Sequence, residues 1–112
     1  MPSHPGRRRH LRVGGRLLTC VVIGSFRHRG LKELFETGKS GRVQPDLQRR
    51  VLVRLDAIEA ATSLDALRQP GFDFHSLRGR PQRYSIHVNG PWCLTFEWQD
   101  GVALRLDLEQ YH

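Results

Sequence analysis

The clearest structural pattern in this chain lies between Tyr84 and Trp98, where residues 84–98 read YSIHVNGPWCLTFEW. On both sides of Asn89-Gly90, apolar residues alternate with polar ones, and this dipeptide is typical of the tight turn in a β-hairpin. An alternation of period two indicates strands with one face in a core and the other face outside it. The segment therefore predicts two antiparallel strands, with Trp92 and Trp98 on the core face of the second.

The alternation continues on both sides of this hairpin. Asp100-Gly101 is a second hairpin signal, so we expect a last strand after it. The expected core face of that strand carries four apolar residues, namely Val102, Leu104, Leu106 and Leu108. Before the hairpin, Phe72 and Phe74 alternate around Asp73, directly after the turn signal Pro70-Gly71. The second half of the chain is thus expected to form an antiparallel meander.

The first half of the chain has mainly helical periodicity. Asp46 is expected to begin a helix, because apolar residues then repeat at helical spacing. They form one stripe, which consists of Leu47, Val51, Leu55 and Ile58, while Gln48, Arg49, Arg50 and Arg54 lie off it. Ser25 is predicted to cap an earlier helix that continues through Phe35, and Thr62–Gln69 to add a further turn of helix. With a strand predicted at Leu17–Ile23, these elements predict an α+β domain.

The composition is that of one folded domain. The chain has 112 residues, of which 38% are hydrophobic and 26% charged, and no run approaches the ~18–20 apolar residues of a transmembrane helix. The formal net charge is +7, but residues 1–21 carry +5 of it and the remaining residues only +2. The charge therefore does not by itself argue for nucleic-acid binding by the folded domain. Cys20 and Cys93 have no metal-ligand spacing, which favours a reducing, cytoplasmic environment.

Residues 1–21 are expected to be a basic, disordered extension. Met1–Gly15 is rich in Pro, Gly and Arg and has no apolar periodicity. A secretory signal is disfavoured, because the apolar run Leu17–Ile23 is short and no small-residue cleavage site follows it. A basic arm that binds RNA remains an alternative.

The polar residues that suggest chemistry gather in the second half of the chain. No phosphate-binding glycine loop, His-x-x-x-His pair or Cys-x-x-Cys pair is present, so the sequence gives no support for a nucleotide or a metal site. Three arginines, Arg78, Arg80 and Arg83, lie between His75 and Tyr84 in an expected loop. Arginine can hold a phosphate, and histidine can move protons near neutral pH. This arrangement suits phosphodiester chemistry, although on composition alone a solvated basic loop is the simpler interpretation.

Several of these segments together resemble one protein family. The matching segments are SFRHRGL (25–31), LFE (34–36), LDA (55–57), FHSLRG (74–79), YSIHVNG (84–90), WCLTF (92–96), DG (100–101) and YH (111–112). In their order and spacing they resemble the HigB branch of the RelE toxin superfamily, the plasmid-maintenance killer proteins. The resemblance covers Val22–His112, so we expect residues 22–112 to form the toxin-like domain.

The resemblance implies a fold, an activity and partners. It implies two N-terminal helices packed on a twisted antiparallel β-sheet. It also implies a ribosome-dependent mRNA endonuclease (an mRNA interferase), without metal or other cofactor, that inhibits translation. A HigA-like helix-turn-helix antitoxin would neutralise it, and the complex would repress its own operon. Most members begin Met-Ile-x-Ser-Phe, and Val22-Ile23-Gly24-Ser25-Phe26 stands in that place, so we hypothesise that translation starts at Val22.

The resemblance also implies site residues for a transesterification by the ribose 2′-hydroxyl. His75 is the candidate proton acceptor and His112 the candidate for the other proton transfer, although the two roles could be reversed. Arg78 would stabilise the transition state, and Tyr111 and Tyr84 would orient or stack a base. Three further residues are candidates for RNA binding, namely Arg80, Arg83 and His87. Alternatives remain for most of them: a half-buried sheet position for His75, a frayed terminus for His112, core packing for Tyr84 and a surface position for His87. His28 is expected to be structural or to face the antitoxin.

Two departures from the family pattern leave the activity open. Many relatives have an active-site arginine where this chain has Cys93, which carries no such charge. Arg80 or Arg83 could supply the missing charge from the loop. Gln110 stands where some relatives have an acidic residue. The alternative function is therefore a catalytically weak or inactive inhibitor that binds RNA or the ribosome and acts mainly within an antitoxin–repressor complex.

Overall fold

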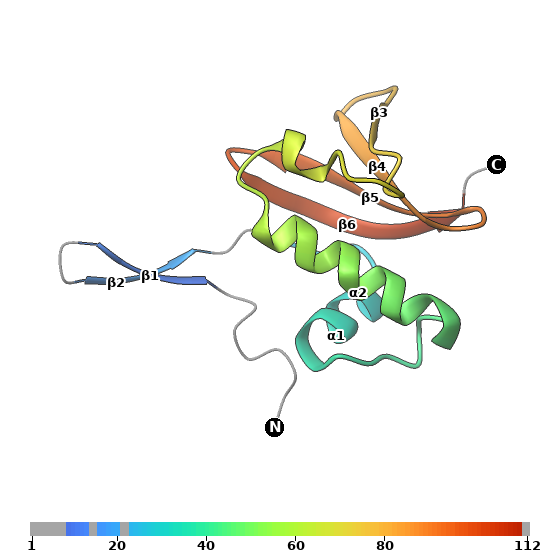
Figure 1. The fold of residues 1–112 in the computed structure, drawn as a ribbon, viewed down its shortest axis with the longest axis horizontal. Helices are drawn as coiled ribbons and strands as arrows, with labels where there is room; N and C mark the ends of the chain where they lie inside the picture. Colours follow the sequence, from blue (N-terminus) through green and yellow to red (C-terminus); the bar gives the residue numbers. More distant parts are fainter. Residues whose placement is uncertain (1–8, 14–15, 21–22, 111–112) are drawn as a thin grey trace.

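The computed structural model of this chain describes residues 9–13, 16–20 and 23–110. The elements of these residues are β1 (Arg9–Val13), β2 (Arg16–Cys20), α1 (Arg29–Thr37), α2 (Pro45–Ala60), the 3₁₀-helix η1 (Leu64–Leu67), β3 (His75–Leu77), β4 (Arg83–Asn89), β5 (Trp92–Gln99) and β6 (Val102–Gln110). Strands β3 to β6 form an antiparallel sheet in the order β3-β4-β5-β6 (Figure 1).

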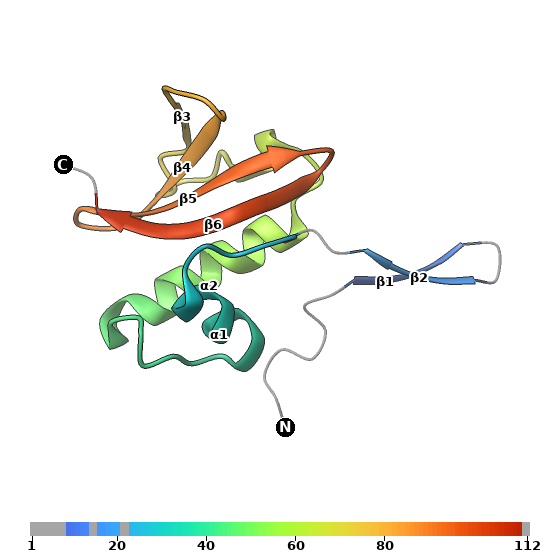
Figure 2. The same ribbon diagram turned by 180° about the vertical axis from the view of Figure 1, so that it is seen from behind.

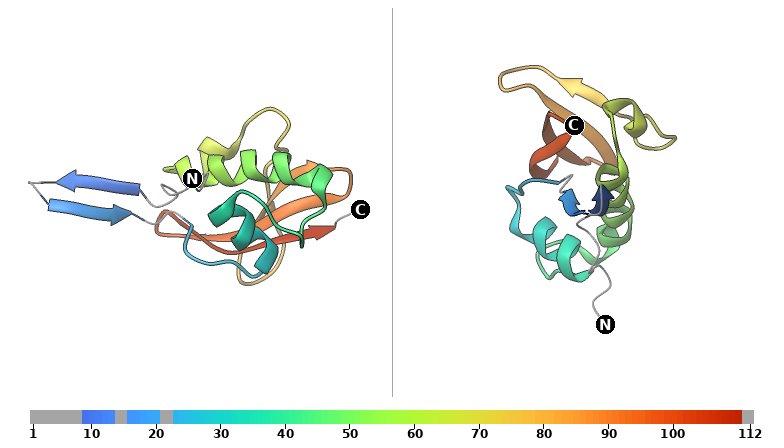
Figure 3. Two further views of the ribbon diagram at one scale, coloured as in Figure 1. Left: turned by 90° about the horizontal axis from the view of Figure 1, so that it is seen from below. Right: turned by 90° about the vertical axis from the view of Figure 1, so that its left-hand side faces the viewer.

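The predicted α+β fold is confirmed. Helix α2 packs against β4, and α1 packs against α2 and β6, so both helices lie on one face of the twisted sheet (Figures 1 and 3). The core between these two layers contains side chains from both helices and from the three long strands. In the described part of the chain, no helix has the length and apolar character needed to cross a membrane.

The N-terminal segment differs from the prediction. Strand β1 lies within the part expected to be disordered, and it pairs with β2 in a separate two-stranded sheet that extends away from the rest of the molecule (Figures 1 and 2). The strand predicted at Leu17–Ile23 is therefore Arg16–Cys20, and it does not join the four-stranded sheet. The physical reason is that Leu11 and Val13 give the apolar run a nearby β-forming partner. Ile23 instead forms an isolated parallel bridge to Ala103 of β6.

Helix α1 begins at a different residue from the one predicted. Its cap is His28, whose Nδ1 accepts a hydrogen bond from the backbone N–H of Leu31 at 3.2 Å. Ser25, the predicted cap, lies beside β6, where its hydroxyl accepts from the N–H of Arg105 at 2.9 Å and its carbonyl accepts from the N–H of Leu106 at 3.1 Å. Ser25 therefore fixes the entering chain to the sheet, and His28 takes the structural role that was one of its alternatives.

Helix α2 agrees with the prediction. Pro45 occupies the first turn, where its missing N–H costs no intrahelical hydrogen bond. The predicted apolar stripe is fully buried: Leu47, Val51, Leu55 and Ile58. Arg54 lies off this stripe and is nevertheless buried, which the periodicity did not predict. The predicted extra helical turn is present as η1.

The predicted meander has the right number of strands, four, but differs in detail. Strand β3 begins only at His75, because Asp73 has a φ of 46° and interrupts the alternation that starts at Phe72. Both hairpin turns are confirmed. In β6 a bulge at Arg105, with a φ of 50°, reverses the alternation. Leu106 and Leu108 are therefore buried as predicted, whereas before the bulge Ala103 is buried in place of Val102 and Leu104.

Gly24 lies where the chain that enters α1 contacts β6. Val102 and Leu104 of β6 lie against the backbone of Gly24, whose N–H donates to the carbonyl of Ala103 at 2.7 Å. A Cβ atom at position 24 would lie 2.8 Å from a methyl group of each of these side chains, which is too close. A side chain at position 24 would therefore force Val102 and Leu104 to shift.

Candidate functional site

The sheet has a second face, on the side away from the helices. Residues directly opposite each other in an antiparallel sheet point to the same side. His75 is opposite Ser85, and Ser85 is opposite Thr95, so these three form a row. Because Ile86 and Leu94, the next residues along, belong to the core, this row faces away from the helices. We call this side the outer face.

A second row on the outer face lies next to the first. His87, two residues after Ser85 on β4, is opposite Cys93, and Cys93 is opposite Glu109 of β6. Diagonal neighbours on a sheet are roughly 7–8 Å apart, so the imidazoles of His75 and His87 belong to one region of the surface. The register therefore brings the two predicted histidines together with Cys93, where relatives were expected to have an arginine.

His75 has the geometry of a proton acceptor. The side chain is exposed, and its Nδ1 lies 2.9 Å from the carbonyl oxygen of Asp73. A carbonyl oxygen only accepts, so this hydrogen bond requires the proton on Nδ1 and leaves the lone pair of Nε2 free in the neutral ring. Nothing in the described residues hydrogen-bonds that second nitrogen. His75 can therefore accept a proton from a bound molecule.

His87 is held in the opposite way. Its Nε2 lies 3.1 Å from the carbonyl oxygen of Gly90, and the side chain is half-buried. The same reasoning places the proton on Nε2 and leaves Nδ1 as the acceptor. His87 is thus a partly covered outer-face residue, tied to the β4–β5 turn.

The predicted basic loop follows strand β3, which begins at His75. Arg78 and Arg80 are exposed in the connection between β3 and β4, and with Arg83 they line an open hollow of about 370 Å³. Gln82 closes the base of the loop, because its amide donates to the carbonyls of Leu77 and Arg83 at 2.7 and 2.9 Å. In the described ranges, neither Arg78 nor Arg80 has an ion pair. Their charges are therefore available to an anionic ligand.

Arg83 is not in the loop, which corrects its predicted position. It is the first residue of β4, and its Nη1 donates to Glu97 at 3.1 Å. Its Nη2 donates to the hydroxyl of Thr95 and to the carbonyl of Arg105, both at 3.0 Å. Thr95 in turn donates to the carboxylate of Glu109. Through Thr95 the side chain of Arg83 belongs to the outer face, but its charge is shared with Glu97.

The structure does not bring Tyr84 to the same place. Tyr84 is half-buried on the helix-covered side of the sheet, where its ring stacks on Phe74 at 5.7 Å and contacts Phe96 at 6.0 Å between ring centroids. The sheet therefore separates Tyr84 from His75, and its contact with a base stays a prediction that this position disfavours. Trp92 and Trp98 pack against the core, as predicted.

The last two predicted site residues, Tyr111 and His112, lie outside the described residues. The strand that leads to them ends at Gln110, which is opposite Trp92 at the start of β5. Cys93 follows directly, and it is buried, in agreement with its interpretation as a small strand residue.

Comparison with known proteins identifies the family. Residues 24–112 match the model of a family described as the RelE-like toxin of the type II toxin–antitoxin system HigB. The chain belongs to the HigB-like toxin family. It is 39% identical over 92 residues to the endoribonuclease HigB of Proteus vulgaris, which covers 81% of this chain and all of that protein. It is 35% identical over 89 residues to the toxin HigB-1 of Vibrio cholerae serotype O1, which covers 77% of this chain and 94% of that protein.

Two residues near the candidate site, Ser85 and Arg54, were not predicted from the sequence. Ser85, in the row between His75 and Thr95, is only 1% exposed, and its hydroxyl has no hydrogen-bond partner among the described residues. Arg54 is 7% exposed and donates to three backbone carbonyls. Burial lowers the pKa of Arg54, and the neighbouring charge of Arg50 adds to this effect. The position of Ser85 on the polar side of β4 was visible in the alternation, whereas nothing in the sequence marked Arg54.

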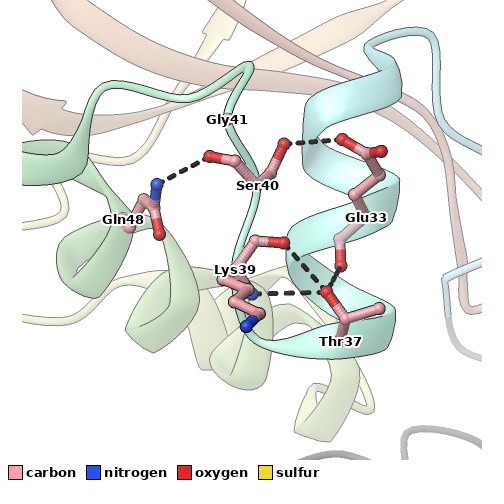
Figure 4. A pocket seen from close by; sticks show the side chains of 6 residues that line it. All are labelled: Glu33, Thr37, Lys39, Ser40, Gly41 and Gln48. Carbon is pink, nitrogen blue, oxygen red and sulfur yellow. Dashed lines mark hydrogen bonds between the residues drawn. The ribbon is translucent and has the colours of Figure 1, made fainter.

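A second hollow, of about 560 Å³, lies between α1 and α2 (Figure 4). Its polar groups bind one another: the hydroxyl of Ser40 donates to Glu33 at 2.7 Å, and the amide of Gln48 donates to the carbonyl of Ser40 at 2.7 Å. Thr37 likewise donates to the carbonyl of Glu33 at 2.8 Å. These contacts join the two helices, so we assign this hollow a structural role. In the described part of the chain, no group of His, Cys, Asp and Glu side chains could hold a metal ion.

Proposed function

We propose that this protein is an endoribonuclease that cleaves messenger RNA on the ribosome and thereby stops translation. Its membership of a family of RelE-like type II toxins supports a role as the toxin of such a system, beside an antitoxin. The name of its relative from Proteus vulgaris supports RNA cleavage. The observation that carries the proposal is the free Nε2 of His75, on the strand that leads into a loop with two arginines without ion pairs in the described ranges.

The proposed reaction is a transesterification in the RNA itself. The ribose 2′-oxygen forms a bond to the adjacent phosphorus, and the bond from phosphorus to the 5′-oxygen breaks. The 2′-hydroxyl gives its proton to Nε2 of His75, and the leaving 5′-oxygen receives a proton from His112. Arg78, with Arg80 beside it, stabilises the negative charge of the five-coordinate phosphate. No metal ion takes part in this scheme.

The proposed partners follow from this activity. The antitoxin is a HigA-like helix-turn-helix protein, and the substrate is mRNA bound in the ribosome, so the protein acts in the cytoplasm. RNA contacts by Arg83 and His87 remain part of the proposal. His87 shares the outer face with His75, while Arg83 can reach RNA only beside its partner Glu97.

A second function has one observation in its favour. Cys93 is buried and brings no positive charge to the outer face, and the guanidinium of Arg83, on the same face, is paired with Glu97. A protein that lacks a positive charge at this position could block translation by binding RNA or the ribosome without cutting. It would then act mainly within an antitoxin–repressor complex.

Chemical mapping of the RNA ends tests the proposed reaction. A defined mRNA is translated in a purified system with the protein, and the new ends are characterised. We expect 2′,3′-cyclic phosphate and 5′-hydroxyl ends, which transesterification must produce. Ends with a 5′-phosphate would contradict the proposed chemistry, and arrested translation with intact mRNA would establish the binding inhibitor instead.

A further inference from the structure

Arg54 lies behind the outer face, on the helix side of the sheet. Its Nε donates to the carbonyl of His87 at 2.7 Å, its Nη1 to the carbonyl of Arg50 at 3.1 Å and its Nη2 to the carbonyl of Gly71 at 3.4 Å. The guanidinium carbon also lies 4.9 Å from the centre of the Phe72 ring. One side chain thus contacts helix α2, strand β4 and the segment that precedes β3.

These contacts extend the sheet beyond its shortest strand. Strand β3 pairs with β4 only as far as His75 and Ser85. At His87, the next position along this edge, the N–H donates to the carbonyl of Phe72 at 2.6 Å, and the carbonyl accepts from Arg54. Arg54 and Phe72 together therefore satisfy the backbone of His87, which would otherwise lie at an unpaired edge.

The same contacts involve the chain segment that leads to His75. Gly71 and Phe72, which contact Arg54, are followed by Asp73, whose carbonyl binds Nδ1 of His75 at 2.9 Å. The backbone at Asp73 has a φ of 46°, an unusual value for a residue with a side chain. A fixed neighbouring segment is needed to hold this conformation. Arg54 is thus linked to His87 through the carbonyl of that residue, and to His75 through the segment Gly71–Asp73.

We infer that Arg54 is a positioning residue for the imidazoles of His75 and His87: it fixes the Gly71–Asp73 segment against β4 at His87. The geometric part of this inference stands on the contacts above, and the effect on cleavage rests on the proposed function. Misplacement of a reacting group by about 1 Å can cost about 100-fold in rate. Lysine cannot replace this residue, because a single ammonium group lacks the planar fork that reaches separate carbonyls.

The first test is spectroscopic and needs no activity. Imidazole ¹⁵N–¹H correlation spectra of the full chain are recorded for the wild type, Arg54→Met, Arg54→Lys and Arg49→Met. Arg49 is exposed on the same helix, so Arg49→Met is a control for the lost charge. We expect the ring signals of His75 and His87 to shift in both Arg54 variants, while those of His28 on α1 stay in place. Unchanged signals of His75 and His87 in a folded Arg54 variant would overturn the inference.

The second test measures cleavage on translating ribosomes. In the Arg54 variants we expect kcat to fall by about tenfold or more, with KM within about twofold of the wild type. Arg49→Met should stay within about twofold for both values. Leu34→Ala, in the core at α1, lowers stability without touching this path and controls for unfolding. If Arg54→Met does not fold, Arg54→Lys decides the result.

The two tests separate two kinds of failure. A wild-type protein that does not cut RNA would contradict the proposed function, while the imidazole spectra would still decide the geometric part. Shifted rings with unchanged kcat would overturn the assignment of Arg54 as a positioning residue for the reaction. An equal loss of kcat in Leu34→Ala at matched stability would overturn it as well.

Discussion

Among single residues, His75 carries the most specific chemical consequence. Its Nδ1 is engaged by a backbone carbonyl and its Nε2 is free, which is the arrangement that a general base requires. The sequence indicated this residue through the family resemblance, but not its tautomer, because the turn at Asp73 that provides the carbonyl was expected to be a regular strand.

Replacing His75 tests this assignment. We expect His75→Gln to lower kcat for ribosome-dependent mRNA cleavage by about 100-fold or more, because an amide does not accept the 2′-proton. The side chain is exposed, so the thermal midpoint should change by less than about 2 °C. Single-turnover cleavage and a melting curve of the same preparation check both values. Unchanged kcat in His75→Gln would exclude His75 as the base.

The buried hydroxyl of Ser85 leads to a prediction about stability. A buried hydroxyl without a partner costs free energy, so Ser85→Ala should leave the free energy of unfolding unchanged or raise it by up to about 1 kcal/mol. Thr95→Val, the matched change at the opposite position of β5, removes the contacts with Arg83 and Glu109 and should lower it by about 1–2 kcal/mol. Urea denaturation of both variants checks the pair. A loss in Ser85→Ala as large as that in Thr95→Val would show that Ser85 has a partner.

At the level of elements, the predictable parts were those with an uninterrupted period. The stripe of α2 and the apolar faces of β4 and β5 follow the sequence closely, because each is buried in a single core. The polar faces of these strands do not, since Ser85, Thr95 and Glu97 are buried as well. The start of α1 and the bulge in β6 depend on contacts between distant residues. Ser25, for example, is a good cap by its chemistry, but β6 binds its hydroxyl instead.

The cap of α1 gives a prediction at this level. His28→Ala removes the acceptor of the Leu31 N–H and should lower the free energy of unfolding by about 0.5–2 kcal/mol. His28→Asn restores a capping oxygen and should recover most of the loss, to within about 0.5 kcal/mol. Denaturant titration of the two variants compares them. An equally large loss in both would mean that His28 acts through something other than its cap.

For the molecule as a whole, the core and the candidate site belong to the same part of the chain. The buried apolar residues of the described core lie between Ile23 and Leu108, and the family match begins at residue 24. The pairing of β3 with β4, which no sequence pattern gives, brings His75 to the face where the alternation put His87 and Cys93. The burial of Arg54 could not be predicted from the sequence either, because its side chain binds carbonyls from three separate segments.

Deletion of residues 1–21 follows from this arrangement. Because the β1–β2 sheet pairs only within itself, we expect the thermal midpoint of the shortened protein to differ by less than about 2 °C from that of the full chain. A lower midpoint by about 5 °C or more would show that the hairpin stabilises the domain.

Binding of the ribosome by both proteins at several salt concentrations would show in addition whether the five arginines of residues 1–21 contact RNA.

The most direct test of the proposed function compares one mRNA in two settings. The full-length protein is mixed with a defined mRNA, either alone or under translation by purified ribosomes, and the RNA is mapped by primer extension. We expect cuts within translated codons in the ribosome sample, and none in the free RNA or with His75→Gln. Cleavage of free mRNA at a similar rate, or intact mRNA in both settings, would contradict a ribosome-dependent endoribonuclease.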